Sequence, residues 1–317
     1  MSHGPVAFLF PGQGSQAAGM GKELAALYPV ARHTFQEADD ALGFAISKLC
    51  FEGPDEQLKL TENTQPAILT MSTAVSRVLQ EKGIVPQFAA GHSLGEYSAH
   101  VTAGTLSFTD AVRTVRERGR YMQEAVPAGE GGMAAILGMP LDQLQQVCND
   151  AAQGQVVSPA NINSPDQIAI SGHQKAVERA AALAKERGAK KTVMLVVSAP
   201  FHCALMQPAQ DRLEKDLKAM RFNDPELPVI ANIDFTAKVT GDDSRQALVR
   251  QVTGAVQWAS CMQTLIASGV KTFIEVGPGK VLTGLMRQID RSQTCMNTEN
   301  EDSIQKVSNL FAAAAKE

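Results

Sequence analysis

Short apolar runs alternate with long stretches of helical periodicity along most of the chain, and this alternation constrains the fold more than any other feature. The run Pro5–Phe10 ends in a glycine-rich loop, as a buried parallel strand does. A helix is predicted over Thr64–Glu81, a strand over Gln87–Ala90, and a further helix that a Ser107-x-x-Asp110 capping box opens. Alternating strands and helices predict a parallel sheet with helices on its faces.

The pattern changes between Gly131 and Val197 and then returns. Strands are predicted there at Met133–Leu137, Val156–Ala160, Gln167–Ser171 and Thr192–Val197, and helices at Leu141–Ala152 and Gln174–Arg187. This βαββαβ order is that of a ferredoxin-like unit, and its length suits a small inserted subdomain. Afterwards a helix from about Cys203 to Ala219 and a strand at Thr272–Val276 continue the first pattern.

We therefore expect an α/β protein with two subdomains. The larger is α/β-hydrolase-like, contains the parallel sheet, and is discontinuous over residues 1–128 and 198–317. The smaller, over residues 129–197, is the ferredoxin-like insertion. The length of 317 residues is enough for one large or two modest domains.

Composition narrows the classes of function. A formal charge of −4 argues against a nucleic-acid or anionic-membrane footprint. The five cysteines are odd in number, widely spaced and lack a Cys-x-x-Cys pair, which favours neither a disulfide framework nor a zinc site. The chain shows no pattern of a secretion signal and no run of 18 apolar residues. We expect a cytoplasmic protein without nucleic-acid or membrane partners.

The segment Gly91-His92-Ser93-Leu94-Gly95 lies between a predicted strand and a predicted helix. Glycines on both sides allow a sharp strand-to-helix turn that exposes the serine hydroxyl at the helix N-terminus. The free N–H groups of that terminus favour negative charge on an attacked carbonyl oxygen. The motif alone is a weak signal, but its position predicts that Ser93 is a nucleophile.

A serine nucleophile needs a base within hydrogen-bond reach. Of the six histidines, His92 adjoins Ser93 and is expected to point elsewhere on the turn, and His100 lies farther down the helix. His202 lies where the chain leaves the last strand of the insertion and re-enters the larger subdomain. It is the candidate base, and a purely structural histidine stays an equal alternative at this point.

A set of short motifs follows one another along nearly the whole chain. They are Phe10–Ser15, Thr64–Ala67, Gly91–Tyr97, Arg118–Gly119, Asn161–Pro165, Pro200–His202 and Glu275–Lys280. In order and spacing they resemble those of the malonyl-CoA:acyl-carrier-protein transacylases of type II fatty acid synthesis. Several motifs in register are far more specific than any one of them.

The resemblance implies a division of roles. Ser93 attacks the thioester carbonyl, and His202 accepts its proton. The backbone N–H groups of Gln13 and Leu94 form the oxyanion hole. The backbone carbonyl of Gln251, rather than a carboxylate, orients His202; a neutral carbonyl adds no negative charge beside a malonyl carboxylate.

The malonyl carboxylate requires a cation in the pocket, and the two-pronged guanidinium of arginine suits it best. Three arginines occur in Arg116-Glu-Arg-Gly-Arg120. The family motif selects Arg118, because it stands immediately before Gly119. Arg116 and Arg120 are expected to be solvated helix charges.

The remaining expectations concern the walls of the site and its surroundings. Phe201 is expected beside the malonyl methylene, where it favours malonyl over branched methylmalonyl units. Asn161 and Asn163 are expected in the same cleft, although Asn-Ser-Pro is also a common turn. Lys190 and Lys191 match basic positions that receive the acidic carrier protein, and a solvated strand end is an equal alternative.

The predicted function is transfer of malonyl from malonyl-CoA to the phosphopantetheine thiol of holo acyl carrier protein, through a malonyl-serine intermediate. The resemblance implies no metal and no redox cofactor, and we expect a monomer. One alternative is a discrete trans-acting acyltransferase of a polyketide synthase. Others are a thioesterase or esterase, with water as acceptor, and a non-catalytic carrier-binding protein.

Overall fold

The larger sheet lies at the centre of the structure and carries the site at one of its ends. The computed structural model describes residues 4–314. Six strands are arranged in the order β10-β9-β1-β2-β7-β8, and all neighbours are parallel except β7 and β8. Their bounds are β1 Val6–Phe10, β2 Phe88–Gly91, β7 Val229–Ile230, β8 Ala237–Lys238, β9 Thr272–Glu275 and β10 Thr294–Asn297.

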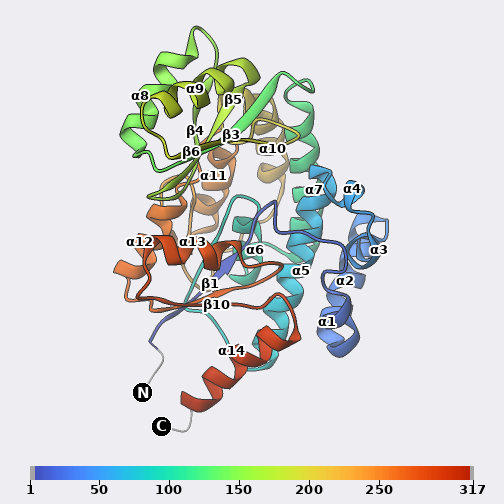
Figure 1. The fold of residues 1–317 in the computed structure, drawn as a ribbon. Coiled ribbons are helices and arrows are strands. Elements are labelled where there is room, and N and C mark those ends of the chain that lie inside the picture. The colour runs from blue at the N-terminus through green and yellow to red at the C-terminus, as the bar shows by residue number, and fades with distance from the viewer. Residues whose placement is uncertain (1–3, 315–317) are drawn as a thin grey trace.

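Helices cover both faces of this sheet (Figure 1). They are α1 Lys22–Leu27, α2 Pro29–Leu42, α3 Ile46–Glu52, α4 Asp55–Leu58, α5 Thr61–Glu81, α6 Gly95–Thr102, α7 Phe108–Glu124, α10 Gln207–Ala219, α11 Gly241–Gln251, α12 Trp258–Ala267, α13 Val281–Ile289 and α14 Glu301–Ala314. Within residues 4–314, none combines the length and apolarity needed to cross a bilayer.

Strand β1 is apolar throughout because both of its faces are buried. Val6, Phe8 and Phe10 belong to the core formed with α2, α5 and α7. Ala7 and Leu9 point the other way, into a second core with α12 and α13. All five side chains are buried, as expected of a central strand in a parallel sheet covered on two sides.

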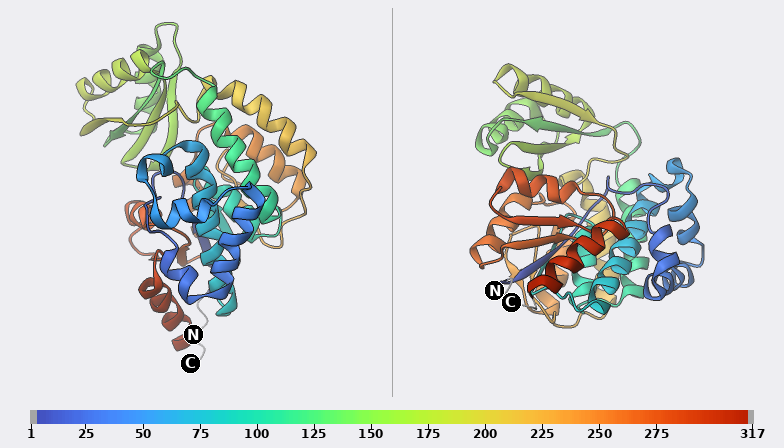
Figure 2. Two further views of the ribbon diagram at one scale, coloured as in Figure 1. Left: turned by 90° about the vertical axis from the view of Figure 1, so that its right-hand side faces the viewer. Right: turned by 60° about the horizontal axis from the view of Figure 1, so that its bottom comes forward.

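A second, antiparallel sheet stands apart from the first (Figure 2). Its strands are β3 Gly131–Leu137, β4 Val157–Ser164, β5 Gln167–His173 and β6 Lys191–Leu195, in the order β4-β5-β3-β6. Helices α8 Leu141–Ala152 and α9 Gln174–Glu186 contribute to a separate apolar core with it. The α/β class and the ferredoxin-like βαββαβ order are therefore confirmed.

Several element bounds differ from the predictions. Strand β4 continues to Ser164, so Asn161 and Asn163 lie in a strand instead of a turn. The cause is tertiary, since the backbone of Val256 bonds to the carbonyl of Ala160 and to the amide of Ile162.

Other bounds and elements also differ from the predictions. Strand β6 ends at Leu195, two residues early, and the helix predicted from Cys203 begins with a 3₁₀ turn at Ala204–Met206. Strands β8 and β10 and helices α13 and α14 were not predicted. The acidic segment Glu299–Asp302 runs into the first turn of α14.

Gly119 sets how closely α7 can approach α5. A Cβ at this position would lie 2.6 Å from the backbone oxygen of Thr61 and 2.8 Å from the Cα of Glu62. Distances of this size require backbone movement. Gly284 in α13 is the contrasting case, because a Cβ there would meet nothing within 4 Å.

We predict opposite effects of alanine at the two helical glycines. Gly119→Ala should lower the free energy of unfolding by about 1 to 3 kcal/mol, because overpacking outweighs the helix propensity of alanine. Gly284→Ala should raise it by up to about 1 kcal/mol. Urea unfolding monitored by circular dichroism measures both. A stabilised Gly119→Ala would contradict the close packing of α5 and α7.

Candidate active site

Ser93 lies on a sharp turn between β2 and α6, with φ of 51°. A left-handed backbone is strained for a serine, so the surroundings must hold it there. A Cβ on Gly91 would lie 1.9 Å from the carbonyl carbon of Gly95, and one on Gly95 would lie 2.0 Å from the carbonyl oxygen of Phe10. Both glycines are therefore required for the turn.

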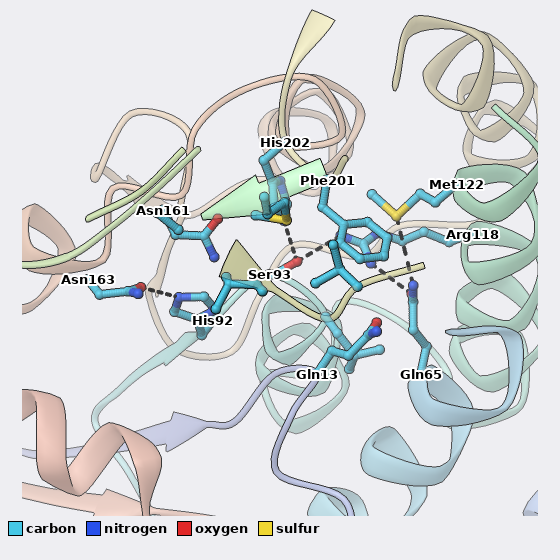
Figure 3. A pocket seen from close by; sticks show the side chains of 15 residues that line it. Gln13, Gln65, His92, Ser93, Arg118, Met122, Asn161, Asn163, Phe201 and His202 are labelled. Atoms are coloured by element: carbon cyan, nitrogen blue, oxygen red, sulfur yellow. Dashed lines mark hydrogen bonds between the residues drawn. The ribbon is translucent and has the colours of Figure 1, made fainter. Parts of the chain in front are cut away.

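His202 faces this serine from the segment that follows β6 (Figure 3). Its Nε2 lies 2.7 Å from Ser93 Oγ, and its Nδ1 lies 2.9 Å from the carbonyl oxygen of Gln251. A carbonyl only accepts hydrogen bonds, so Nδ1 carries the proton and the Nε2 lone pair faces the serine hydroxyl. Burial, aided by the charge of Arg118, lowers the pKa of His202 to about 3, which keeps the ring neutral and leaves the Nε2 lone pair free to accept a proton.

Arg118 of α7 is a buried cation at the same point. Its guanidinium donates to Ser93 Oγ at 3.1 Å, to the side-chain oxygen of Gln251 at 2.9 Å and to that of Gln65 at 2.7 Å. Its side chain is 2% exposed, and burial lowers its pKa, an effect that Tyr97 and Glu96 oppose. All three hydrogen-bond partners are neutral, so an anion in the cavity is the natural further partner.

Gln13 and Leu94 both line the cavity beside Ser93. Gln13 lies in the loop after β1, and its side chain donates to Thr61 Oγ1 at 3.2 Å. Leu94 is the N-cap residue of α6, where backbone N–H groups have no partner within the helix. The structure thus brings both predicted oxyanion-hole positions to the nucleophile.

The opposite wall comes from the small sheet and the segment before His202. Asn161, Asn163 and Phe201 line the cavity. His92 does so as well, but its ring points away from Ser93, as expected. Its Nε2 lies 2.8 Å from Asn163 Oδ1 of the small sheet, and its ring packs against Trp258 of α12.

Lys190 and Lys191 lie outside the cavity. Both are exposed, and Lys191 begins β6, the edge strand whose other end, Leu195, lines the cavity. Leu195 lies four residue steps along the strand from Lys191, a distance of about 13 Å. The two lysines therefore cannot touch an acyl group on Ser93, whereas a large partner can contact them.

The two other arginines of the motif differ from each other. Arg120 is exposed and pairs with Glu117, as expected of a surface charge. Arg116 is only half-exposed, which corrects the expectation of a solvated charge. Its guanidinium lies 4.3 Å from the ring centre of Phe44 and donates to Asn63 Oδ1, because α2 and α5 flank this part of α7.

Three further residues at the site were missed by sequence reasoning. Gln65 holds Arg118, while Glu96 and Asn232 lie behind the turn. Gln65 and Glu96 belong to motifs already noted, so a signal existed. Asn232 follows the two-residue strand β7, and nothing in the local pattern marks it.

The arrangement combines the parts that acyl transfer needs. A hydroxyl faces a neutral imidazole, two backbone positions can receive a developing oxyanion, and a buried cation faces the reacting oxygen. Within the described part of the chain, no group of three or more His, Cys, Asp or Glu side chains could hold a metal ion.

Comparison with known proteins agrees with this chemistry. The family model of the acyl transferase domain matches residues 7–308. The malonyl CoA-acyl carrier protein transacylase of Escherichia coli K12 is 52% identical over 284 residues, or 89% of this chain and 92% of that protein. The Bacillus subtilis 168 protein of the same name is 50% identical over 95% of both chains.

Solved structures agree as well. The malonyl CoA-acyl carrier protein transacylase of Coxiella burnetii has a TM-score of 0.94 at 44% identity and covers 96% of this chain and 97% of its own. A malonyl-transacylase in complex with a type II polyketide synthase acyl-carrier protein has a TM-score of 0.95 at 44% identity and covers 96% and 99%. This chain therefore belongs to the acyl transferase family, among its malonyl CoA-acyl carrier protein transacylases.

Proposed function

We propose that this chain transfers malonyl groups from malonyl-CoA to the phosphopantetheine thiol of holo acyl carrier protein, supplying fatty acid synthesis. The observation that carries the proposal is the convergence of Ser93, His202 and Arg118 on one oxygen in a buried cavity. The first two supply the nucleophile and its base. The third supplies the charge that distinguishes malonyl from a neutral acyl group.

The reaction proceeds in two halves at Ser93. Its oxygen forms a bond to the thioester carbonyl carbon while Nε2 of His202 takes the hydroxyl proton. The carbonyl oxygen becomes an oxyanion, which the amides of Gln13 and Leu94 receive. Collapse breaks the carbon–sulfur bond, and the leaving CoA sulfur takes the proton from His202. The malonyl ester remains on Ser93.

The second half runs in reverse with another thiol. The carrier thiol gives its proton to Nε2 of His202, and its sulfur attacks the ester carbonyl. The oxyanion forms again at the same two amides. The carbon–oxygen bond breaks, Ser93 regains its proton from His202, and malonyl leaves on the carrier. Gln251 keeps the ring in one tautomer throughout, through its backbone carbonyl.

Substrate selection rests on Arg118 and Phe201. A malonyl carboxylate can accept hydrogen bonds from the guanidinium and gives it the charged partner that it lacks among the described residues. Phe201 fills space next to His202 and limits room for a branch on the malonyl methylene. Asn161 contributes a buried side-chain oxygen that has no hydrogen-bond partner among the described residues, which leaves an acceptor for an amide of the pantetheine arm.

Strand β6 supports the carrier-docking part of the proposal. Val193 and Met194 of β6, between the exposed pair Lys190–Lys191 and the cavity, remain exposed, as does Val196 just beyond the strand. A basic end followed by an apolar edge suits a partner that is acidic and delivers a long, partly apolar arm.

A polyketide carrier is a second candidate acceptor. It is favoured by the solved complex of a malonyl-transacylase with a polyketide synthase carrier, which is 44% identical to this chain. The chemistry at Ser93 is the same for both carriers. Transfer rates to a panel of fatty-acid and polyketide carriers separate the two.

Carrier transfer is tested with radiolabelled malonyl-CoA and purified holo carrier. We expect label on the carrier, with little free malonate. Reversing both charges, as Lys190→Glu with Lys191→Glu, should slow transfer to the carrier while acylation by malonyl-CoA stays unchanged, because the lysines lie outside the cavity. Release of label mainly to water would indicate a thioesterase, and an equal loss in both steps would refute a docking role.

Arg118→Ala should reduce malonyl transfer by about 2 to 5 kcal/mol in kcat/KM, the range for removing one partner of a buried charge pair. Acetyl transfer should fall less, because acetyl has no carboxylate. Arg118→Lys is the matched control that keeps the charge but loses the bidentate geometry. Its kcat/KM for malonyl transfer should lie between those of the wild type and Arg118→Ala. Equal losses for malonyl and acetyl donors would contradict carboxylate recognition by Arg118.

A further inference from the structure

A carboxylate is buried directly behind the nucleophile. Glu96, in the first turn of α6, has no exposed surface. Its Oε2 accepts from the backbone amide of Asn232 at 2.9 Å and from Nε2 of Gln251 at 2.8 Å, whereas its Oε1 has no hydrogen-bond partner among the described residues. No step of the acyl transfer described above uses this group.

The side chain of Gln251 has only one workable orientation. Its Nε2 donates to the backbone oxygen of Ser93 at 3.0 Å, which can only accept, and to Oε2 of Glu96 at 2.8 Å, which also accepts from the amide of Asn232. Its Oε1 therefore points the other way, to the guanidinium of Arg118 at 2.9 Å. If the amide were inverted, Oε1 of Gln251 would face the oxygens of Ser93 and Glu96, and its NH₂ would face the guanidinium of Arg118.

Glu96 also holds the turn itself through Asn232. The side-chain oxygen of Asn232 accepts from the amide of Ser93 at 2.7 Å, and its NH₂ donates to the carbonyl of Gly91 at 2.7 Å. These bonds fix the backbone on both sides of a residue with positive φ. Glu96 thus positions both Gln251 and Asn232, and these two residues fix the turn at Ser93.

Charge gives Glu96 a second connection to Arg118. Arg118 has only neutral hydrogen-bond partners, and the carboxylate lies one amide group away, across Gln251. Burial raises the pKa of Glu96 to about 7, while its hydrogen bonds from Asn232 and Gln251 and the charge of Arg118 oppose that rise. These contacts therefore keep part of the Glu96 population ionised near neutral pH.

We infer that Glu96 is a positioning residue for malonyl selectivity: by holding the carboxamide of Gln251 in one orientation, it aims the guanidinium of Arg118 at the acyl site. This rests on the proposed function. It predicts an effect on the choice of acyl group in addition to any effect on the turn. A residue that only stabilised the fold would slow all donors equally.

The experiment measures the second-order rate of Ser93 acylation by malonyl-CoA and by acetyl-CoA, and their ratio, in folded variants. Glu96→Ala removes the acceptor, and Glu96→Met removes it while filling the space. Glu96→Gln keeps one accepting oxygen. Gln251→Met removes the carboxamide but keeps the backbone carbonyl that holds His202. Glu275→Ala is the matched control, because it removes another buried carboxylate, one that accepts from the amides of Leu282 and Thr283.

We expect Glu96→Ala and Glu96→Met to lower the malonyl-to-acetyl ratio by about tenfold or more, the scale for losing a hydrogen bond to a charged group. Glu96→Gln should restore most of it, and Glu275→Ala should leave the ratio as in the wild type. In the Gln251→Met background, removing Glu96 should lower the ratio no further, because the two act in series.

Three results would overturn the inference: an unchanged ratio in the Glu96 variants, no rescue by glutamine, or additive effects in the double variant. If Glu96→Ala fails to fold, Glu96→Met and Gln251→Met carry the same comparison. Wild-type enzyme that forms no malonyl-serine would instead refute the proposed function. If the wild type is active and the Glu96 variants lose malonyl and acetyl acylation equally, only the positioning role is refuted.

Discussion

The 2.7 Å contact between Ser93 Oγ and His202 Nε2 is the interaction on which the site depends, and the two residues come from segments more than a hundred positions apart. Both have positive φ, at 51° and 58°. Two strained backbones facing each other persist only when their surroundings over-determine them. Close backbone approach at Gly91 and Gly95 does so on the serine side, and the carbonyl of Gln251 fixes the ring of His202.

Electrostatics organises the rest of the cavity around that contact. A neutral imidazole sits beside a buried guanidinium, and that cation in turn is surrounded by amide and hydroxyl oxygens instead of carboxylates. An aspartate in the position that Gln251 occupies would neutralise Arg118 and repel a malonyl anion. The use of a backbone carbonyl to orient His202 is thus consistent with a substrate that brings its own negative charge.

Local patterns in the sequence predicted much of this. The apolar run of β1, the Ser107 cap of α7 and the βαββαβ order of the insertion are periodicities and spacings that need no tertiary information. The resemblance to a known family added Arg118 and Gln251, which no spacing could have singled out. The structure places Arg118 in the cavity wall and Gln251 behind it, in contact with both His202 and Arg118, while their roles in the reaction stay predictions.

What the sequence could not predict depends on contacts between distant segments. Strand β4 lengthens because Val256 bonds to it from the other subdomain. Asn232 and Glu96 meet behind the turn although 136 positions separate them. His92 faces the cavity because Asn163 of the small sheet reaches it. Hydrophobic periodicity describes one helix or strand at a time, so it cannot predict contacts between distant segments.

Acylation of Ser93 is measured most directly by the mass of the peptide that contains it, after incubation with malonyl-CoA in the absence of carrier. We expect one malonyl group on that serine in the wild type and none in Ser93→Ala, with both proteins folded. Malonylation that persists in Ser93→Ala, or that maps to another residue in the wild type, would contradict it.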